Sequence, residues 1–164
     1  MQTLADEDTP QQPLRYVAFM SYAREDEAVA ARLQRRLETY AIPKSIGADQ
    51  NTLRPVFRDR TELSVHHSLG DAIQAALQDS RALIVLCSPS AKASKWVNEE
   101  INTFLKIHPG APIYAALLEG TPDTSFPDSL AQDGIEPLAA DLTDGNFRLG
   151  LNQLVASMLN VSLD

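Results

Sequence analysis

Trp96 and Glu100 stand four residues apart in a segment whose apolar residues recur at helical spacing. Residues four apart share one face of a helix, so the indole and the carboxylate lie on the same side. Glu100 falls beside Thr103 at the edge of the apolar arc, whereas Glu99 points into water. A carboxylate at such a boundary could line a pocket and stabilise positive charge that develops on a substrate. The apolar arc itself, which is expected to face the core, consists of Val97, Ile101, Phe104 and Leu105.

Geometry alone favours a simpler role for Glu100. Most glutamates on helices are surface residues, and one at a core boundary can be satisfied by a nearby arginine. Trp96 is also open to two interpretations: an aromatic wall against a bound ribose, or a partly buried residue on the flank of the helix. The spacing therefore identifies Glu100 as a candidate without deciding between these roles.

Further polar residues follow the predicted strands, where a parallel α/β sheet binds its ligands. The first three strands are followed by Ser21-Tyr-Ala-Arg24, Arg58-Asp-Arg60 and Ser88-Pro89. Arg24 could pair with a phosphate or be a plain surface arginine. Arg58 and Asp59 could contact a nucleotide, bind a neighbouring protomer or pair within their own loop. For these two residues we favour a role in ligand binding or assembly.

Short apolar runs alternate with helical stripes along the chain. Strands are predicted over 15–21, 55–57, 82–87 and 112–118, with a weaker one over 135–138, where Pro137 suits only an edge. Helices are predicted over 25–40, 69–77, 94–107 (with Ser94 as N-cap) and 151–159. Strands that alternate with helices form βαβ units and a parallel sheet. We therefore predict an α/β fold, a flavodoxin-like three-layer sandwich with a five-stranded parallel sheet and helices on both faces.

The composition of the 164 residues suits one domain and excludes several classes of protein. A single cysteine permits no internal disulfide, and no apolar run approaches the roughly 20 residues that a membrane helix needs. The formal net charge of -8 opposes direct binding to nucleic acid or to an anionic membrane. We expect a cytoplasmic protein with a flexible leader over residues 1–14 and a folded domain over 15–164.

The sequence lacks the motifs of several well-known enzyme classes. It contains no G-x-G-x-x-G, no G-x-x-x-x-G-K-[ST], no G-x-S-x-G and no zinc-type spacing of Cys and His. His66 and His67 are adjacent, which suits a solvated loop better than a metal site. Cys87 ends an apolar strand, which favours an inert core thiol over a nucleophile. We therefore expect neither a metal nor a thiol-based reaction.

Four short segments follow one another along the chain. They are an F-x-S-Y strand, a second strand with the loop after it, a central strand ending in S-P and a W-x-x-x-E helix, at Phe19–Tyr22, Arg54–Leu63, Ala82–Pro89 and Trp96–Glu100. In this order, and with the right elements between them, they resemble the motifs of Toll/interleukin-1 receptor (TIR) domains, in which the second strand leads into the BB loop. The resemblance runs from about Tyr16 to Val161. Each motif is weak alone, but the set is specific.

This resemblance implies an activity and a catalytic residue. Enzymatic TIR domains break the nicotinamide–ribose bond of NAD⁺ and place a glutamate at the last position of W-x-x-x-E, which is Glu100 here. NAD⁺ is then a substrate rather than a cofactor, and the products are nicotinamide with ADP-ribose or a cyclic isomer of it. Together with the residues at the strand ends, the candidate substrate-binding residues are Phe19, Ser21, Arg24, Arg58, Asp59 and Trp96.

The resemblance also implies partners. Family members commonly act when packed side by side, so we expect NAD⁺ and other TIR protomers as partners, in a homo-oligomer or filament. A TIR effector is ordinarily joined to a sensor, so we expect the chain to be part of a longer protein or complex that serves bacterial anti-phage immunity. The alternative is a non-catalytic TIR scaffold. The loop over 61–68 lacks the proline of several animal adaptors, which favours the bacterial, enzymatic branch.

Overall fold

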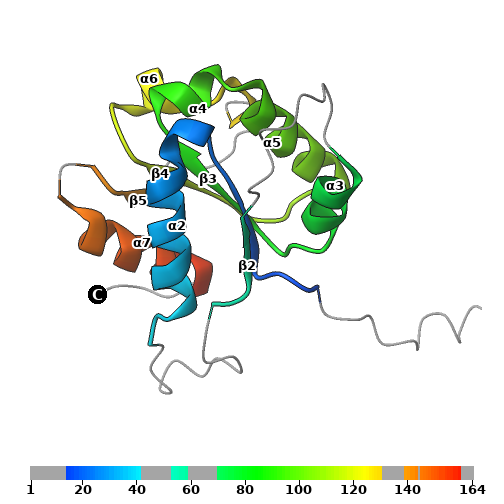
Figure 1. The fold of residues 1–164 in the computed structure, drawn as a ribbon, viewed down its shortest axis with the longest axis horizontal. Coiled ribbons are helices and arrows are strands. Elements are labelled where there is room, and N and C mark those ends of the chain that lie inside the picture. The colour runs from blue at the N-terminus through cyan, green and yellow to red at the C-terminus, as the bar shows by residue number, and fades with distance from the viewer. Residues whose placement is uncertain (1–13, 42–52, 59–69, 131–138, 144, 160–164) are drawn as a thin grey trace, which may run out of the picture.

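The computed structural model describes residues 14–41, 53–58, 70–130, 139–143 and 145–159. Figure 1 shows a sheet between two layers of helices. Five parallel strands form this sheet in the order β2-β1-β3-β4-β5. The prediction of an α/β sandwich with a five-stranded parallel sheet and helices on both faces is confirmed.

The strands coincide with the apolar runs of the sequence, with one exception. They are β1 (Ala18–Ser21), β2 (Val56–Arg58), β3 (Leu83–Cys87), β4 (Ile113–Leu117) and β5 (Ala140–Asp141). The fifth strand is displaced from the predicted range of 135–138, which lies outside the described residues. The reason is that β5 pairs with β4 through only two residues, one of them the polar Asp141, so it leaves no apolar run to recognise.

The predicted helices are all present. A single 3-10 turn, η1 (Arg24–Asp26), leads into α2 (Glu27–Glu38), and the others are α3 (Asp71–Gln78), α5 (Lys95–Ile107) and α7 (Phe147–Leu159). Ser94 caps α5 as predicted, because its hydroxyl accepts a hydrogen bond of 3.2 Å from the Val97 N–H. Two further helices, α4 (Pro89–Ala93) and α6 (Pro122–Ser125), escaped prediction because helices this short carry no periodic stripe.

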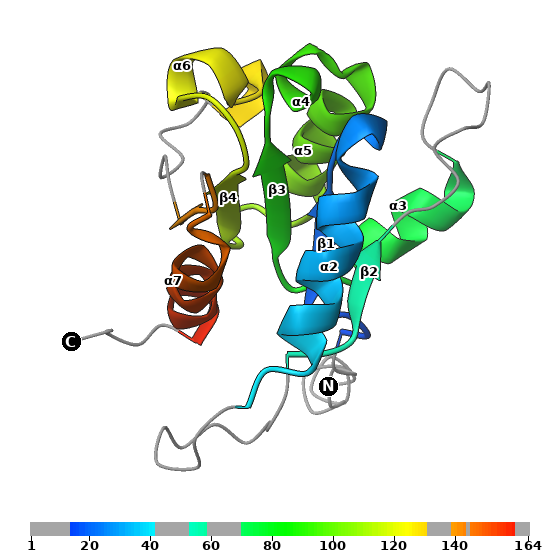
Figure 2. The same cartoon turned by 60° about the vertical axis from the view of Figure 1, so that its left-hand side comes forward.

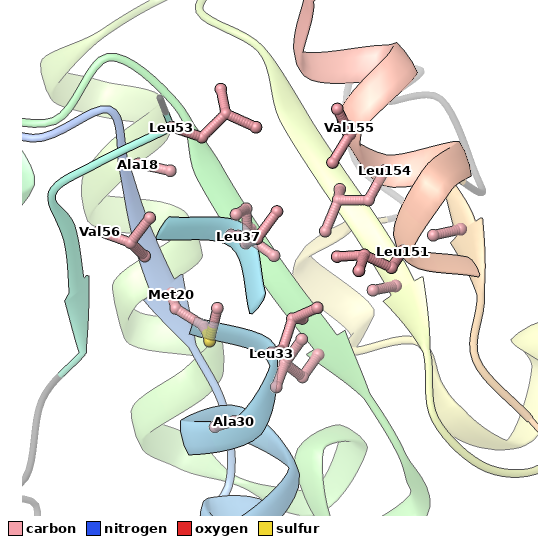
Figure 3. Close-up of a cluster of buried hydrophobic side chains, with 14 of the residues drawn as sticks. Ala18, Met20, Ala30, Leu33, Leu37, Leu53, Val56, Leu151, Leu154 and Val155 are labelled. Carbon is pink, nitrogen blue, oxygen red and sulfur yellow. The ribbon is translucent and has the colours of Figure 1, made fainter. Parts of the chain in front are cut away.

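One hydrophobic core lies between the sheet and the helices α2 and α7. Met20 of β1 points into it together with Leu33 and Leu37 of α2 and Leu151 and Leu154 of α7, as Figure 3 shows. All five side chains are buried. Burying an aliphatic side chain of this size contributes roughly 1.5–3 kcal/mol, so this cluster fixes both helices on the sheet.

A second core lies on the opposite face of the sheet, under α3 and α5. It is filled by buried residues that include Phe19, Leu77, Val85, Ile101 and Phe104. Because side chains alternate along a strand, Ser21 of β1 points to the same face as Phe19. The last residue of β1 therefore lies beside the helix that carries Glu100.

Gly150 of α7 lies against β5 at the edge of the sheet. A Cβ atom at this position would collide with the backbone oxygen of Asp141 in β5 and with the side chain of Leu142. We expect Gly150→Ala to lower the free energy of unfolding by about 1–3 kcal/mol, because the helix must move away from the sheet. Urea denaturation measures this change. The higher helix propensity of alanine, worth about 1 kcal/mol, acts in the other direction, so a gain in stability would show that α7 can shift freely.

Candidate active site

Glu100 lies inside the protein, next to the end of β1. The residue is 5% exposed, which puts it deeper than the core boundary expected from its helical position. The Ser21 hydroxyl donates a hydrogen bond of 2.6 Å to Glu100 Oε1, and Ser21 is itself buried. Burying a carboxylate costs free energy unless hydrogen bonds compensate for the lost water. The contact with Ser21 therefore couples this carboxylate of α5 directly to the central part of the sheet.

A pocket of about 620 Å³ opens at this end of the sheet. Figures 1 and 2 show that α4 and the start of α2 lie together there. The pocket is formed by the turn that follows β1, by α4 and by the first turn of α5, and its lining residues are Ala23, Arg24, Glu25, Pro89, Ser90, Ala93, Ser94 and Trp96. Its volume falls within the range of about 300–1,000 Å³ that is typical of small-molecule sites.

Arg24, from the turn after β1, and Trp96, from the first turn of α5, thus line the same pocket. Arg24 is exposed and Trp96 is half-buried. Glu100 is not part of the lining, but it stands one helical turn beyond Trp96 on the same face of α5. The pocket therefore presents a cation and an aromatic ring close to a buried carboxylate.

Arg58 lies on the other face of the sheet, under α2. Its side chain is 5% exposed, and its Nε donates a hydrogen bond of 2.9 Å to Gln34 Oε1. Its Nη1 lies 3.3 Å from the Tyr22 hydroxyl and 3.6 Å from Glu27 Oε2. These contacts join the end of β2 to α2 and leave Arg58 apart from the pocket. Asp59, which follows it, lies outside the described residues.

Phe19 is fully buried in the second core. Its ring stacks on Phe57 of β2, with centroids 5.1 Å apart and planes inclined by 22°. Direct contact with a ligand would require the ring to leave this stack. In this structure Phe19 therefore supports the strand that carries Ser21, and a contact with substrate stays a prediction.

A hydrogen bond between Asp26 and Ser88 joins two walls of the pocket. Ser88 Oγ donates to Asp26 Oδ2 at 2.6 Å and accepts the Ala91 N–H at 3.1 Å, which caps α4. The sequence analysis did not single out Asp26. Its partner carried a usable signal, because Ser88 followed by Pro89 is the N-cap and N1 pattern that begins a helix.

The pKa of Asp26 gives a prediction for stability. Partial burial raises this pKa above 3.8, the hydrogen bond from Ser88 opposes the rise, and the charges of Glu25 and Glu119 add to it. The folded state therefore binds the proton of the Asp26 carboxyl more tightly than the unfolded state does. Protonation of Asp26 stabilises the fold, and this contribution is fully present below pH 3.8 and is lost as the pH rises through the folded pKa. Asp26→Asn has no charge to bury. We expect this variant to gain in melting temperature over the wild type at about pH 7 and less at about pH 3.

An amide oxygen can still accept the Ser88 hydrogen bond, so Asp26→Asn keeps the contact while it removes the charge. Thermal unfolding followed by circular dichroism at both pH values measures the difference. A larger gain at the acidic pH than at the neutral pH would contradict the assignment.

The single cysteine is buried at the end of the central strand β3. Cys87 has no exposed surface, and burial raises the pKa of its thiol to about 12. A thiol reacts as the thiolate, which this environment suppresses at neutral pH. The structure agrees with the interpretation of Cys87 as an inert core thiol.

Across the described ranges of the chain, no three His, Cys, Asp or Glu side chains gather as metal ligands do. The same residues include no helix that combines the length and the apolar character needed to cross a bilayer.

Comparison with known proteins shows the family of the chain. It is 41% identical over 100 residues to NAD(+) hydrolase ApTIR from Actinoplanes sp. (strain ATCC 31044 / CBS 674.73 / SE50/110), a match that covers 58% of this chain and 13% of that protein. It is 20% identical to the TIR domains of the activated Roq1 resistosome that directly recognises the pathogen effector XopQ, with a TM-score of 0.49 and coverage of 90% of this chain and 85% of that one. The family model described as TIR domain matches residues 18–155, from the start of β1 into α7, and the chain therefore belongs to the TIR domain family.

Proposed function

We propose that this TIR domain cleaves NAD⁺ at the nicotinamide–ribose bond, with Glu100 as the catalytic residue. The observation that carries the proposal is a buried carboxylate, 5% exposed and hydrogen-bonded to Ser21, one helical turn from a pocket lined by Trp96. A relative that is 41% identical over 100 residues bears the name NAD(+) hydrolase, which supports NAD⁺ as the substrate. The chain spans only 13% of the length of that relative. Support for the activity therefore comes mainly from the side chains of this domain.

The reaction suits a lone carboxylate. The C1′–N1 bond breaks, its electron pair stays on N1, and nicotinamide leaves as a neutral molecule that needs no general acid. Positive charge moves to the ribose ring, as it does in glycoside cleavage. An ionised Glu100 stabilises this charge electrostatically or accepts hydrogen bonds from the ribose hydroxyls. Water then attacks C1′ and releases a proton, which gives ADP-ribose, whereas attack by the adenine of the same molecule gives a cyclic isomer.

The proposal gives the other candidate residues graded roles. Trp96 is proposed to wall the nicotinamide ribose, and Arg24 to pair with the pyrophosphate, since both line the pocket. Ser21 is proposed to act on the substrate indirectly, because its hydrogen bond holds the Glu100 carboxylate in place. The burial of Phe19 and the internal contacts of Arg58 favour supporting roles for these two residues.

A role in assembly is proposed for Asp59, since the side chain of Arg58 is engaged inside the domain. Arg24 and Glu25 are exposed, so one wall of the pocket is open to solvent and available to a second TIR protomer. We propose that the active form is a homo-oligomer or filament. In the relative from Actinoplanes the matched region is 13% of the length, so other parts of the protein accompany it there. By analogy, we propose that this domain is a cytoplasmic effector that answers a sensor in bacterial defence against phage.

The test is NAD⁺ consumption by the purified protein, with products identified by chromatography over a wide range of protein concentration. We expect nicotinamide and ADP-ribose, or a cyclic isomer, with a specific activity that rises steeply with protein concentration. Self-association without nicotinamide release at any concentration would favour the non-catalytic scaffold instead.

A further inference from the structure

Two separate segments of the chain form the walls of the pocket. One is the turn over residues 23–25, which follows β1, and the other runs from Pro89 in α4 to Trp96 in α5. Asp26 comes directly after the first wall and Ser88 directly before the second. Neither residue belongs to the lining itself, so each can act on a ligand only through its neighbours.

The contact between these residues is short and half-buried. Ser88 Oγ and Asp26 Oδ2 are 2.6 Å apart, across 62 residues of sequence, and Ser88 is 1% exposed. The same hydroxyl accepts the Ala91 N–H, so it fixes the start of α4 while it holds Asp26. A hydrogen bond with a charged partner is among the stronger ones in proteins.

The backbone of Asp26 also shapes the first wall. Its backbone N–H donates a hydrogen bond of 2.8 Å to Ala23 O, which shapes the turn that presents Arg24 and Glu25 to the pocket. The side chain of Asp26 then ties this turn to Ser88. One residue thus sets both the form of the first wall and its distance from the second.

We propose that Asp26 and Ser88 are positioning residues that fix the separation of the two pocket walls, and so the affinity of the site for its nucleotide substrate. The identity of that substrate rests on the proposed function, whereas the geometric role does not. Both residues lie outside the pocket lining, so neither is placed against the reacting atoms. Their loss should weaken ground-state binding more than it slows the chemical step.

The structure supplies variants that separate this role from general support of α4. Asp26→Ala and Ser88→Ala break the contact, and Asp26→Asn keeps an acceptor of the same shape but removes the charge. Asp128→Ala is the matched control, since Asp128 is exposed and anchors α4 from the other side through a 3.0 Å contact with Lys92 Nζ. Thermal unfolding of each variant establishes that it is folded before the assays.

The first readout needs neither ligand nor turnover. Trp96 is the only tryptophan of the chain and lines the pocket, so its fluorescence reports on the separation of the walls. We expect acrylamide to quench Trp96 measurably more strongly in Asp26→Ala and Ser88→Ala than in the wild type. Quenching in Asp26→Asn and Asp128→Ala should match the wild type. Unchanged quenching in both contact-breaking variants would overturn the proposal.

The second readout is steady-state NAD⁺ cleavage. We expect KM to rise about tenfold in Asp26→Ala, with kcat within about twofold of the wild type, and Asp26→Asn to restore KM. If Asp26→Asn is as impaired as Asp26→Ala, the charge matters rather than the contact, and the positioning role is wrong. If the wild type cleaves no NAD⁺, the proposed function fails by itself, and the quenching experiment still decides whether Asp26 and Ser88 hold the pocket.

Discussion

Glu100→Gln is expected to lower the rate of NAD⁺ cleavage by about 100-fold to 1,000-fold at saturating substrate. The amide has nearly the shape of the carboxylate, and its oxygen can still accept the 2.6 Å hydrogen bond from Ser21. What the substitution removes is the negative charge that opposes the cation on the ribose. Losses of this size follow when one electrostatic stabiliser of a transition state is removed from an active site.

Glu99→Gln is the matched control for this prediction. It makes the same change of charge one residue earlier in α5, at a half-buried position that neither lines the pocket nor enters the proposed chemistry. Nicotinamide release, measured by chromatography at equal protein concentration, compares the two variants. If Glu100→Gln kept more than about a tenth of the wild-type rate, Glu100 would not supply the charge, and the proposed mechanism would be wrong.

Leu154→Ala is expected to cause the largest loss of stability, about 2–5 kcal/mol in the free energy of unfolding. Leu154 of α7 has no exposed surface, and it packs on the core under α2 that Figure 3 shows. Its truncation removes buried apolar surface and leaves a cavity that the surrounding side chains can fill only in part. Urea denaturation, analysed as a two-state transition, gives the difference.

The same helix offers a control of the same type. Leu149 lies five residues earlier in α7 and is 54% exposed, so Leu149→Ala should change the free energy of unfolding by less than about 0.5 kcal/mol. The contrast between the two leucines tests whether α7 is fixed by its buried face or only by its connection to β5. Equal effects of the two substitutions would mean that the helix is not packed as described.

Most of the fold could be predicted because its strongest signals are local. The strand β3 (Leu83–Cys87) is an unbroken apolar run, the pattern of a strand covered on both faces. For the helix α5, Ser94 predicts the N-terminus as its N-cap, and an apolar stripe predicts the buried face. The sequence also places Glu100 at the edge of that stripe, although the side chain is more deeply buried than an edge position indicates.

What could not be predicted depends on contacts between distant segments. The partners Asp26 and Ser88 are 62 residues apart, and nothing local distinguishes Asp26 from the exposed residues beside it. Arg58 pairs in register with Met20 and so shares its face of the sheet. The sequence shows that strand side chains alternate, but it does not say which face α2 will cover, and that decides whether Arg58 reaches the pocket.

Because Cys87 is buried, the reactivity of its thiol measures how often the domain opens. Because this thiol is the only one in the chain and has no exposed surface, a maleimide can modify it only when β3 leaves the sheet. The rate of modification then counts cooperative openings of the sheet, without any engineered label. A nucleotide that binds only the closed domain must slow the modification of Cys87 in proportion to the occupancy of the pocket. The reactivity of this one thiol therefore measures ligand binding.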